Sequence, residues 1–223
     1  MIGSGVRPIT HALTWLFNGD LSPVDAYGTA SAGATLQFIG SMTQLSFGTE
    51  PPVSYVFIPA GTGLVIPSEF TLFDEAWSAT ASNPDAEWLL EVKFKMAGVL
   101  DYRIVDTSEG VDSLRGIVVR DGLLQYYSCG SPSSSAVVFA NQWTTLRVSM
   151  SLSGFASWVD GVLSTPRELC PDMTPLEHLA ANNKSVRLFP DSFYGDTDVW
   201  IASVKVLVAS GTLNPAVHHP NPL

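Results

Sequence analysis

The stretch from 142 to 163 constrains the fold of this chain more than any other segment. Apolar and polar side chains alternate in two runs, 142–150 and 154–163. Alternation with a period of two places one set of side chains on each face of a strand. A short turn joins the runs, and Asp160-Gly161 marks a turn of the kind that β-hairpins use. The stretch therefore predicts the central hairpin of an antiparallel sheet.

Similar alternation recurs along the chain, whereas helical periodicity is nearly absent. Residues 91–96 alternate in the same way, and Asp121-Gly122 predicts a second hairpin turn. Many short strands separated by turns favour a two-sheet antiparallel sandwich over alternating strands and helices. The final strand, 199–208, is expected to have one apolar face, made by Trp200, Ala202, Val204, Val206 and Val208.

One short helix is expected near 175–181. Thr174 suits the capping position, Pro175 the first helical position, and Glu177 completes a capping box. The chain is otherwise predicted to divide into three parts. These are an extended arm at 1–10, a single β domain at 11–210, and an extended proline-rich tail at 211–223.

The order of these motifs resembles the laminin-G-like, or concanavalin A-like, jelly roll. The resemblance covers roughly residues 11 to 210. Five segments match the family in order: a first strand with an Asp-containing loop at 13–28, a central strand at 86–94, a hairpin at 114–127, the pair of strands at 143–161 and a closing strand at 199–208. The resemblance implies an all-β, two-sheet antiparallel jelly-roll sandwich. It leaves function open, because the family includes glycosidases, lectins, adhesion modules and viral structural proteins.

The charge balance narrows the range of partners. The chain has 11 lysines and arginines against 21 aspartates and glutamates, a formal net charge of −10. Direct binding to nucleic acid or to an anionic membrane surface is disfavoured, since both need clustered cations. The sequence predicts no targeting segment and no transmembrane helix. Cys129 and Cys170 are either two free thiols or one pair.

The chain is expected to have no catalytic site and no cofactor-binding site. In the family that the chain resembles, the hydrolase branch carries Glu and Asp alternating on one strand, as Glu-x-Asp-x-(x)-Glu, and this sequence contains no such run. No Gly-x-Ser-x-Gly motif occurs either. We therefore predict that the protein is not an enzyme.

Calcium is the one metal that the sequence brings forward. Members of the jelly-roll family that the chain resembles bind calcium through loop oxygens. In this sequence Asp191, Asp196 and Asp198 cluster near the final strand. The alternative interpretation is that these aspartates cap backbone groups in turns.

Aromatic and histidine side chains supply the candidate contacts to a ligand or partner. They are Tyr126, Tyr127, Tyr194, His218 and His219. Trp143 and Trp158 are interpreted instead as scaffold, in the core or on a sheet surface.

Two functions from different classes fit the sequence. The first is a structural virion protein of a tailed bacteriophage, made in the host cytoplasm. In this hypothesis it is a homo-oligomeric capsid-decoration subunit that docks on the major capsid protein or other virion proteins through its extended ends. The alternative is a glycan-binding, lectin-like module of a phage fibre or bacterial surface protein.

Overall fold

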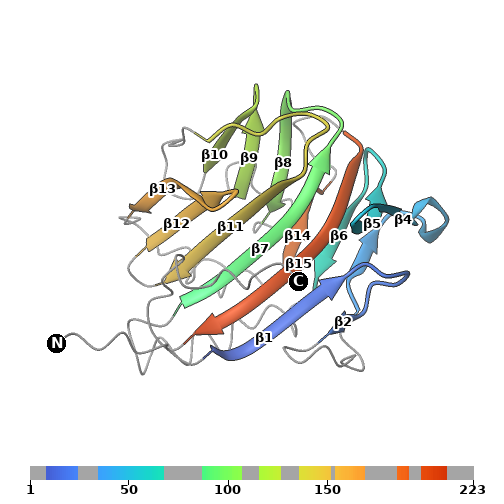
Figure 1. Cartoon of the computed structure of the whole chain (residues 1–223), viewed down its shortest axis with the longest axis horizontal. Coiled ribbons are helices and arrows are strands. Elements are labelled where there is room, and N and C mark those ends of the chain that lie inside the picture. Colours follow the sequence, from blue (N-terminus) through green and yellow to red (C-terminus); the bar gives the residue numbers. More distant parts are fainter. Residues whose placement is uncertain are drawn as a thin grey trace.

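Two antiparallel β-sheets face each other across one hydrophobic core (Figure 1). This arrangement confirms the predicted all-β jelly-roll sandwich. The computed structural model describes residues 9–24, 35–67, 87–106, 116–126, 136–151, 154–168, 185–190 and 197–209.

Helical structure is almost absent from the described part of the chain. It contains one short 3-10 turn, η1 (Met42–Gln44), and no helix there is long and apolar enough to cross a membrane. The helix predicted near 175–181 and the predicted tail at 211–223 lie outside the described residues. So do residues 1–8 of the predicted arm, whereas its last two residues already belong to the first strand.

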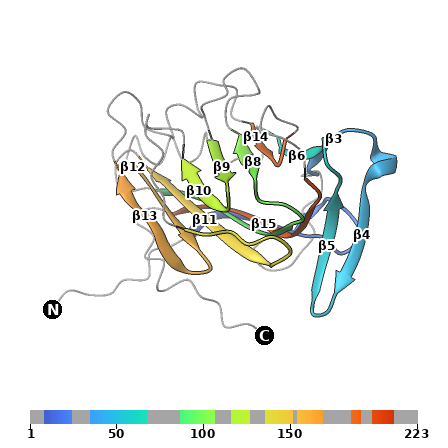
Figure 2. The same cartoon turned by 90° about the horizontal axis from the view of Figure 1, so that it is seen from above.

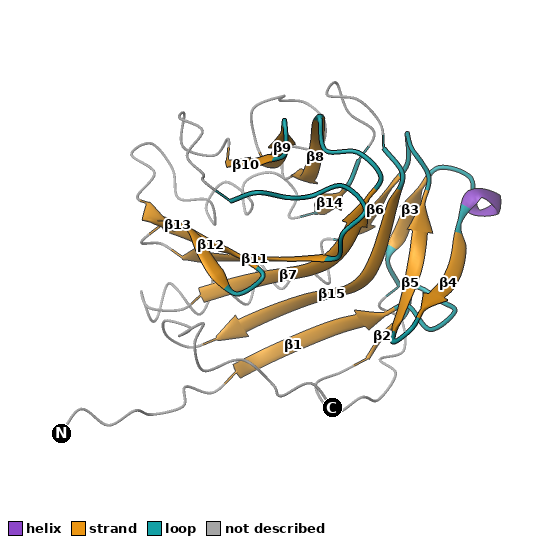
Figure 3. Ribbon diagram, turned by 45° about the horizontal axis from the view of Figure 1, so that its top comes forward, coloured by secondary structure: helices purple, strands orange, loops and turns teal. Residues whose placement is uncertain are grey.

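The larger sheet has nine strands (Figures 1 and 3). They are β1 (Ile9–Leu16), β2 (Pro23–Val24), β4 (Ser46–Glu50), β5 (Val53–Ile58), β7 (Glu87–Met96), β11 (Thr144–Ser151), β12 (Gly154–Val159), β13 (Val162–Glu168) and β15 (Val199–Ala209). Their order is β13-β12-β11-β7-β15-β1-β2, and the β4–β5 hairpin joins through β5 to the first residues of β15. Along the edge of β15 that faces away from β7, the first residues pair with β5 and the residues from Ser203 onward pair with β1.

The smaller sheet has six strands and covers the inner face of the larger one (Figure 2). They are β3 (Gln37–Ile39), β6 (Gly63–Ile66), β8 (Asp101–Asp106), β9 (Gly116–Arg120), β10 (Leu123–Tyr126) and β14 (Val186–Leu188), in the order β10-β9-β8-β14-β6-β3.

Strand β7 shows how the sequence pattern builds the core. Its inward side chains are at most 1% exposed and are Trp88, Leu90, Val92, Phe94 and Met96. The Phe94 ring lies 5.1 Å from that of Phe189, which follows β14 in the smaller sheet. Alternate positions point outward, so the lysines at 93 and 95 lie on the outer face of the larger sheet.

The predicted face of the closing strand is wrong in its first half. Ala202 is an extra residue in the pairing of β15 with β7, because Ile201 lies opposite Phe94 and Ser203 opposite Lys93. Such a bulge shifts the alternation by one residue. The inward residues of β15 are therefore Val199, Ile201, Val204 and Val206. Trp200 pairs with Lys95 and lies on the outer face.

Both predicted Asp-Gly turns are two-residue hairpin connections. Asp121 and Gly122 have φ values of 50° and 76°, and Asp160 and Gly161 have 50° and 80°. Two successive positive φ values match the twist of the flanking strands. Asparagine, aspartate and glycine tolerate such values best, which is why these dipeptides could be recognised in the sequence.

Replacement of Phe94 by Ala should lower the free energy of unfolding by about 3–5 kcal/mol, because it leaves a cavity in the fully buried core. Urea unfolding followed by circular dichroism measures the loss. As a control, Val162→Ala removes carbon atoms from a side chain that is 72% exposed and should change stability by less than about 0.5 kcal/mol. Equal effects of the two variants would contradict this core.

Candidate functional site

The predicted calcium ligands are only partly within the described residues. Asp198 lies just before β15, and its Oδ1 accepts a hydrogen bond from the Ala60 N–H at 3.0 Å. Asp191 and Asp196 lie outside the described residues. Within the described ranges, no group of three His, Cys, Asp or Glu side chains is placed to hold a metal ion. Asp198 thus caps a backbone group, and calcium binding stays a prediction.

The predicted ligand and partner contacts also remain predictions. Tyr126 ends β10 opposite Ile117, but its side chain is not among the described ones. The other predicted contacts and both cysteines lie outside the described residues: Tyr127, Tyr194, His218, His219, Cys129 and Cys170.

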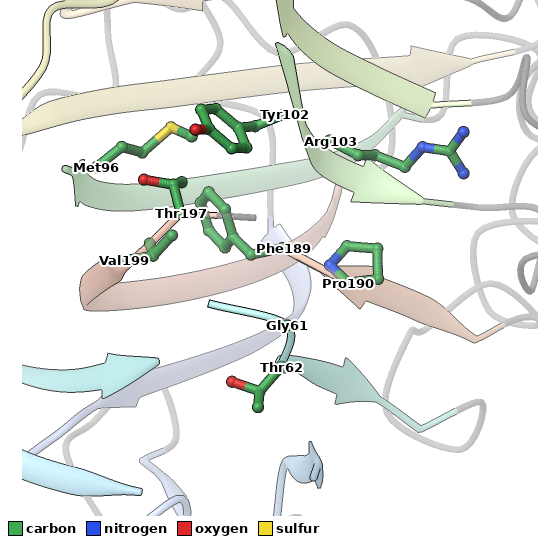
Figure 4. Close-up of a pocket in the computed structure, with 9 residues that line it drawn as sticks. All are labelled: Gly61, Thr62, Met96, Tyr102, Arg103, Phe189, Pro190, Thr197 and Val199. Carbon is green, nitrogen blue, oxygen red and sulfur yellow. The ribbon is translucent and has the colours of Figure 1, made fainter. Parts of the chain in front are cut away.

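A small pocket opens between the two sheets (Figure 4). Its lining residues are Gly61, Thr62, Met96, Tyr102, Arg103, Phe189, Pro190, Thr197 and Val199. The cavity volume of about 20 Å³ suffices for a water molecule and is far too small for a sugar ring. Arg103 lies 3.3 Å from Asp106, and both side chains are buried, so this arginine contributes to the fold.

The more informative feature is a group of aromatic side chains on the outer face of the larger sheet. We call Tyr55, Phe57, Trp143 and Trp200 the aromatic cluster. Trp200 of β15 lies opposite Lys95 of β7 and also opposite Phe57 of β5. Trp143 immediately precedes β11, whose first residue pairs with Phe94. The cluster therefore extends from β5 across β15 and β7 to the start of β11.

Lys95 lies at the centre of the cluster. Its Nζ is 5.2 Å from the ring centroid of Trp143 and 4.9 Å from that of Trp200. These are cation–π distances, and the same ammonium group donates a hydrogen bond to Glu50. This hydrogen bond is the main reason that the pKa of Glu50 lies below its ordinary value. The lysine is thus fixed by two rings and one carboxylate.

The β4–β5 hairpin carries Glu50 and Tyr55, which contact Lys95 and Trp143. Figure 2 shows the hairpin at one end of the sheet, extending beyond its outer side. From this hairpin Glu50 reaches Lys95, and the Tyr55 ring lies 6.2 Å from that of Trp143. Gly48 makes the packing possible, because a Cβ at this position would lie 2.5 Å from the Tyr55 hydroxyl. Side chains of the hairpin therefore pack directly against side chains of the central strands.

The rings are held in place while part of each remains accessible. The Phe57 and Trp200 rings lie 5.4 Å apart, and all four members of the cluster are half-buried. The indole N–H of Trp143 is buried and has no acceptor at hydrogen-bond geometry, although it is near enough to Glu50 to help lower the pKa of that carboxyl. The cluster presents apolar ring surface beside charged groups.

A second charged group lies further along the same face. Arg147 of β11 donates two hydrogen bonds to Glu91 of β7, and Lys205 Nζ lies 3.5 Å from the same carboxylate. Burial on its own would raise the pKa of Glu91, but Lys205 and Arg147 outweigh this effect and lower the pKa. Trp158 is 9% exposed and lies opposite Arg147 on β12. Glu91, Arg147 and Lys205 therefore form a charged group on this face, with the Trp158 side chain beside it.

Sequence reasoning missed most of this site. It placed Trp143 in the core or on a sheet surface, and the structure has it on the sheet surface, whereas Trp200 was placed on the wrong face. Tyr55, Phe57 and Lys95 carried no signal of their own. The alternation of 91–96 did place Lys95 on the outer face, and the tryptophan just before the next strand was the one available hint of an aromatic neighbour.

Comparisons with known proteins extend the fold assignment. No family model matches the chain, and no curated protein matches it either. Among solved structures, the binding domain of botulinum neurotoxin DC in complex with rat synaptotagmin II is similar, with a TM-score of 0.60 and 10% identity over 94% of this chain and 49% of that one.

Two further neurotoxin structures are similar over the same extent. The botulinum neurotoxin DC binding domain in complex with SialylT has a TM-score of 0.56 and 11% identity over 94% of this chain and 49% of that one. A structure of botulinum neurotoxin type C, whose uptake by cells depends on two ganglioside molecules, has a TM-score of 0.56 and 10% identity over 93% and 49%. This chain spans about half of these neighbours, and the likeness is one of fold.

At pH 7, Glu91→Gln should lower the free energy of unfolding by about 1–3 kcal/mol, because it leaves Arg147 and Lys205 without their carboxylate on a largely buried part of the face. The folded-state pKa of Glu91 lies below its ordinary value of 4.5. The wild-type carboxylate therefore stabilises the fold fully above about pH 4.5, and this contribution is lost as the pH falls through the folded-state pKa. The difference between the two proteins should shrink in that window.

Urea unfolding at a series of pH values measures both effects. The control is Arg120→Gln, which removes an ion pair with Asp101 whose partners are 39% and 37% exposed. Such a pair contributes about 0–1 kcal/mol. A loss from Glu91→Gln that is no larger than the control, or that does not change with pH, would contradict the proposed network.

Proposed function

We propose that this chain is a non-enzymatic binding module that recognises glycans through the aromatic cluster on the outer face of its larger sheet. The observation that supports this proposal is the arrangement of Trp143 and Trp200 around Lys95, beside Glu50. Flat ring faces pack against the C–H face of a sugar, and adjacent charged groups hydrogen-bond its hydroxyl groups.

Preorganisation of the cluster favours this role. The two tryptophans and Tyr55 contact one another or Lys95, so their rotamers are restricted before a ligand arrives. A binding surface that is already ordered loses less conformational entropy on association. All four residues of the cluster are half-buried, so part of each ring remains accessible to a ligand.

The structural neighbours support binding over catalysis as the general class of function. Two of the three are binding domains, in complex with rat synaptotagmin II and with SialylT, and cell entry of the third, botulinum neurotoxin type C, depends on two ganglioside molecules. Those ligands belong to the neurotoxins. For this chain we propose only the general class, a binding module that is not an enzyme.

The virion role stays a prediction from the sequence. Nothing in the comparisons supports a capsid protein as partner, a homo-oligomer or a place in a phage particle. A binding module is also compatible with a fibre or a bacterial surface protein, which is the setting that the glycan-binding alternative assumed.

Trp143→Ala and Trp200→Ala should each weaken glycan binding at least about tenfold, which corresponds to ~1.4 kcal/mol, because each removes a ring from the centre of the surface. A glycan array identifies the ligands, and isothermal titration then measures the affinities of the variants.

Phe139→Ala is the matched control, because its ring is 56% exposed but lies outside the cluster, in the segment beside β10. The control should bind like the wild type. If both tryptophan variants keep full affinity while remaining folded by circular dichroism, the cluster is not the binding surface.

A further inference from the structure

The outer face of the larger sheet differs in charge from the rest of the chain. The chain carries a net charge of −10 with only 11 lysines and arginines. Four of these cations occupy outward positions on three adjacent strands, namely Lys93, Lys95, Arg147 and Lys205. Glu50 and Glu91 are the carboxylates that pair with them. Asp160 adds a third carboxylate beside Thr145, so this part of the face has an excess of one positive charge.

Most of these cations are already engaged. Lys95 pairs with Glu50, whereas Arg147 and Lys205 share Glu91. An ammonium or guanidinium group that has a carboxylate partner gains less from a second anion, since the first has already lowered its potential.

Lys93 differs from the other three. Among the described residues no carboxylate lies within ion-pair distance of its Nζ. Its cross-strand neighbours are Thr145 on β11 and Ser203 on β15, whose hydroxyl groups are neutral. The Asp160 carboxylate lies in the same region, where it accepts a hydrogen bond from the Thr145 N–H at 2.8 Å, but it is not within ion-pair distance of Lys93. Lys93 is thus a half-buried cation with hydroxyl groups on both sides.

The position of Lys93 relative to the aromatic cluster is fixed by strand geometry. Lys93 and Lys95 are two residues apart on β7 and point to the same side. Side chains with this spacing are separated by roughly 6.5–7 Å along a strand. An anionic group on a sugar stacked against Trp143 or Trp200 would be within reach of Lys93.

We infer that the face selects an anionic saccharide, in which Lys93 receives a carboxylate or sulfate group while a ring of the same glycan packs on the aromatic cluster. This inference rests on the proposed glycan-binding function and adds the charge of the ligand. The negative charge of the whole chain repels polyanions at long range, so binding depends on the local match at Lys93.

The test uses the full chain and an array that carries each core oligosaccharide in neutral, carboxylated and sulfated forms. We expect binding to the carboxylated or sulfated forms and little to their neutral counterparts. For the anionic glycan that binds best, Lys93→Gln should weaken binding about fivefold or more, and Lys93→Arg should restore most of the affinity. Raising the salt concentration should weaken the wild type and change Lys93→Gln less.

Arg120→Gln is the matched control, because it removes the same charge from an exposed position on the smaller sheet. It should leave anionic glycan binding unchanged. Equal binding of neutral and anionic forms, or an equal effect of Lys93→Gln and the control, would overturn the inference and leave the proposed function standing. Failure of every glycan form to bind would contradict the proposed function itself.

Discussion

The pairing of β7 with β15 on one side and β11 on the other is the constraint on which the rest of the molecule depends. β7 lies in the middle of the larger sheet, and its inward side chains fill the core against the smaller sheet. The same alternation directs Glu91, Lys93 and Lys95 outward. A shift of one residue in this register would place charged groups in the core and apolar groups outside. Alternate side chains of β7 therefore build the core on one face of the sheet and the proposed binding surface on the other.

The β4–β5 hairpin supplies side chains that the central strands of the larger sheet do not. It contributes Glu50 and Tyr55, which contact Lys95 and Trp143. The bulge at Ala202 contributes in a different way, because it turns Trp200 outward without moving the following valines out of the core. The cluster thus arises from one irregularity within the sheet and one hairpin at its side.

Local patterns in the sequence were enough to predict the sandwich. The alternation around Val92 and around Leu146 and the two Asp-Gly turns depend on neighbouring residues, and the structure confirms them. The bulge has no sequence marker, because it is a property of how two strands pair, and Trp200 was therefore placed on the wrong face. The contacts of Tyr55 and Glu50 join distant segments, and periodicity contains no information about such packing.

NMR of the tryptophan indole N–H groups gives the most direct test of ligand binding on the outer face of the larger sheet. The chain has six tryptophans, of which Trp15 and Trp88 are fully buried between the sheets. Titration with a glycan that binds should shift the signals of Trp143 and Trp200 and leave those of Trp15 and Trp88 in place. If the protein is saturated with glycan while the Trp143 and Trp200 signals stay unchanged, the outer face is not the binding surface.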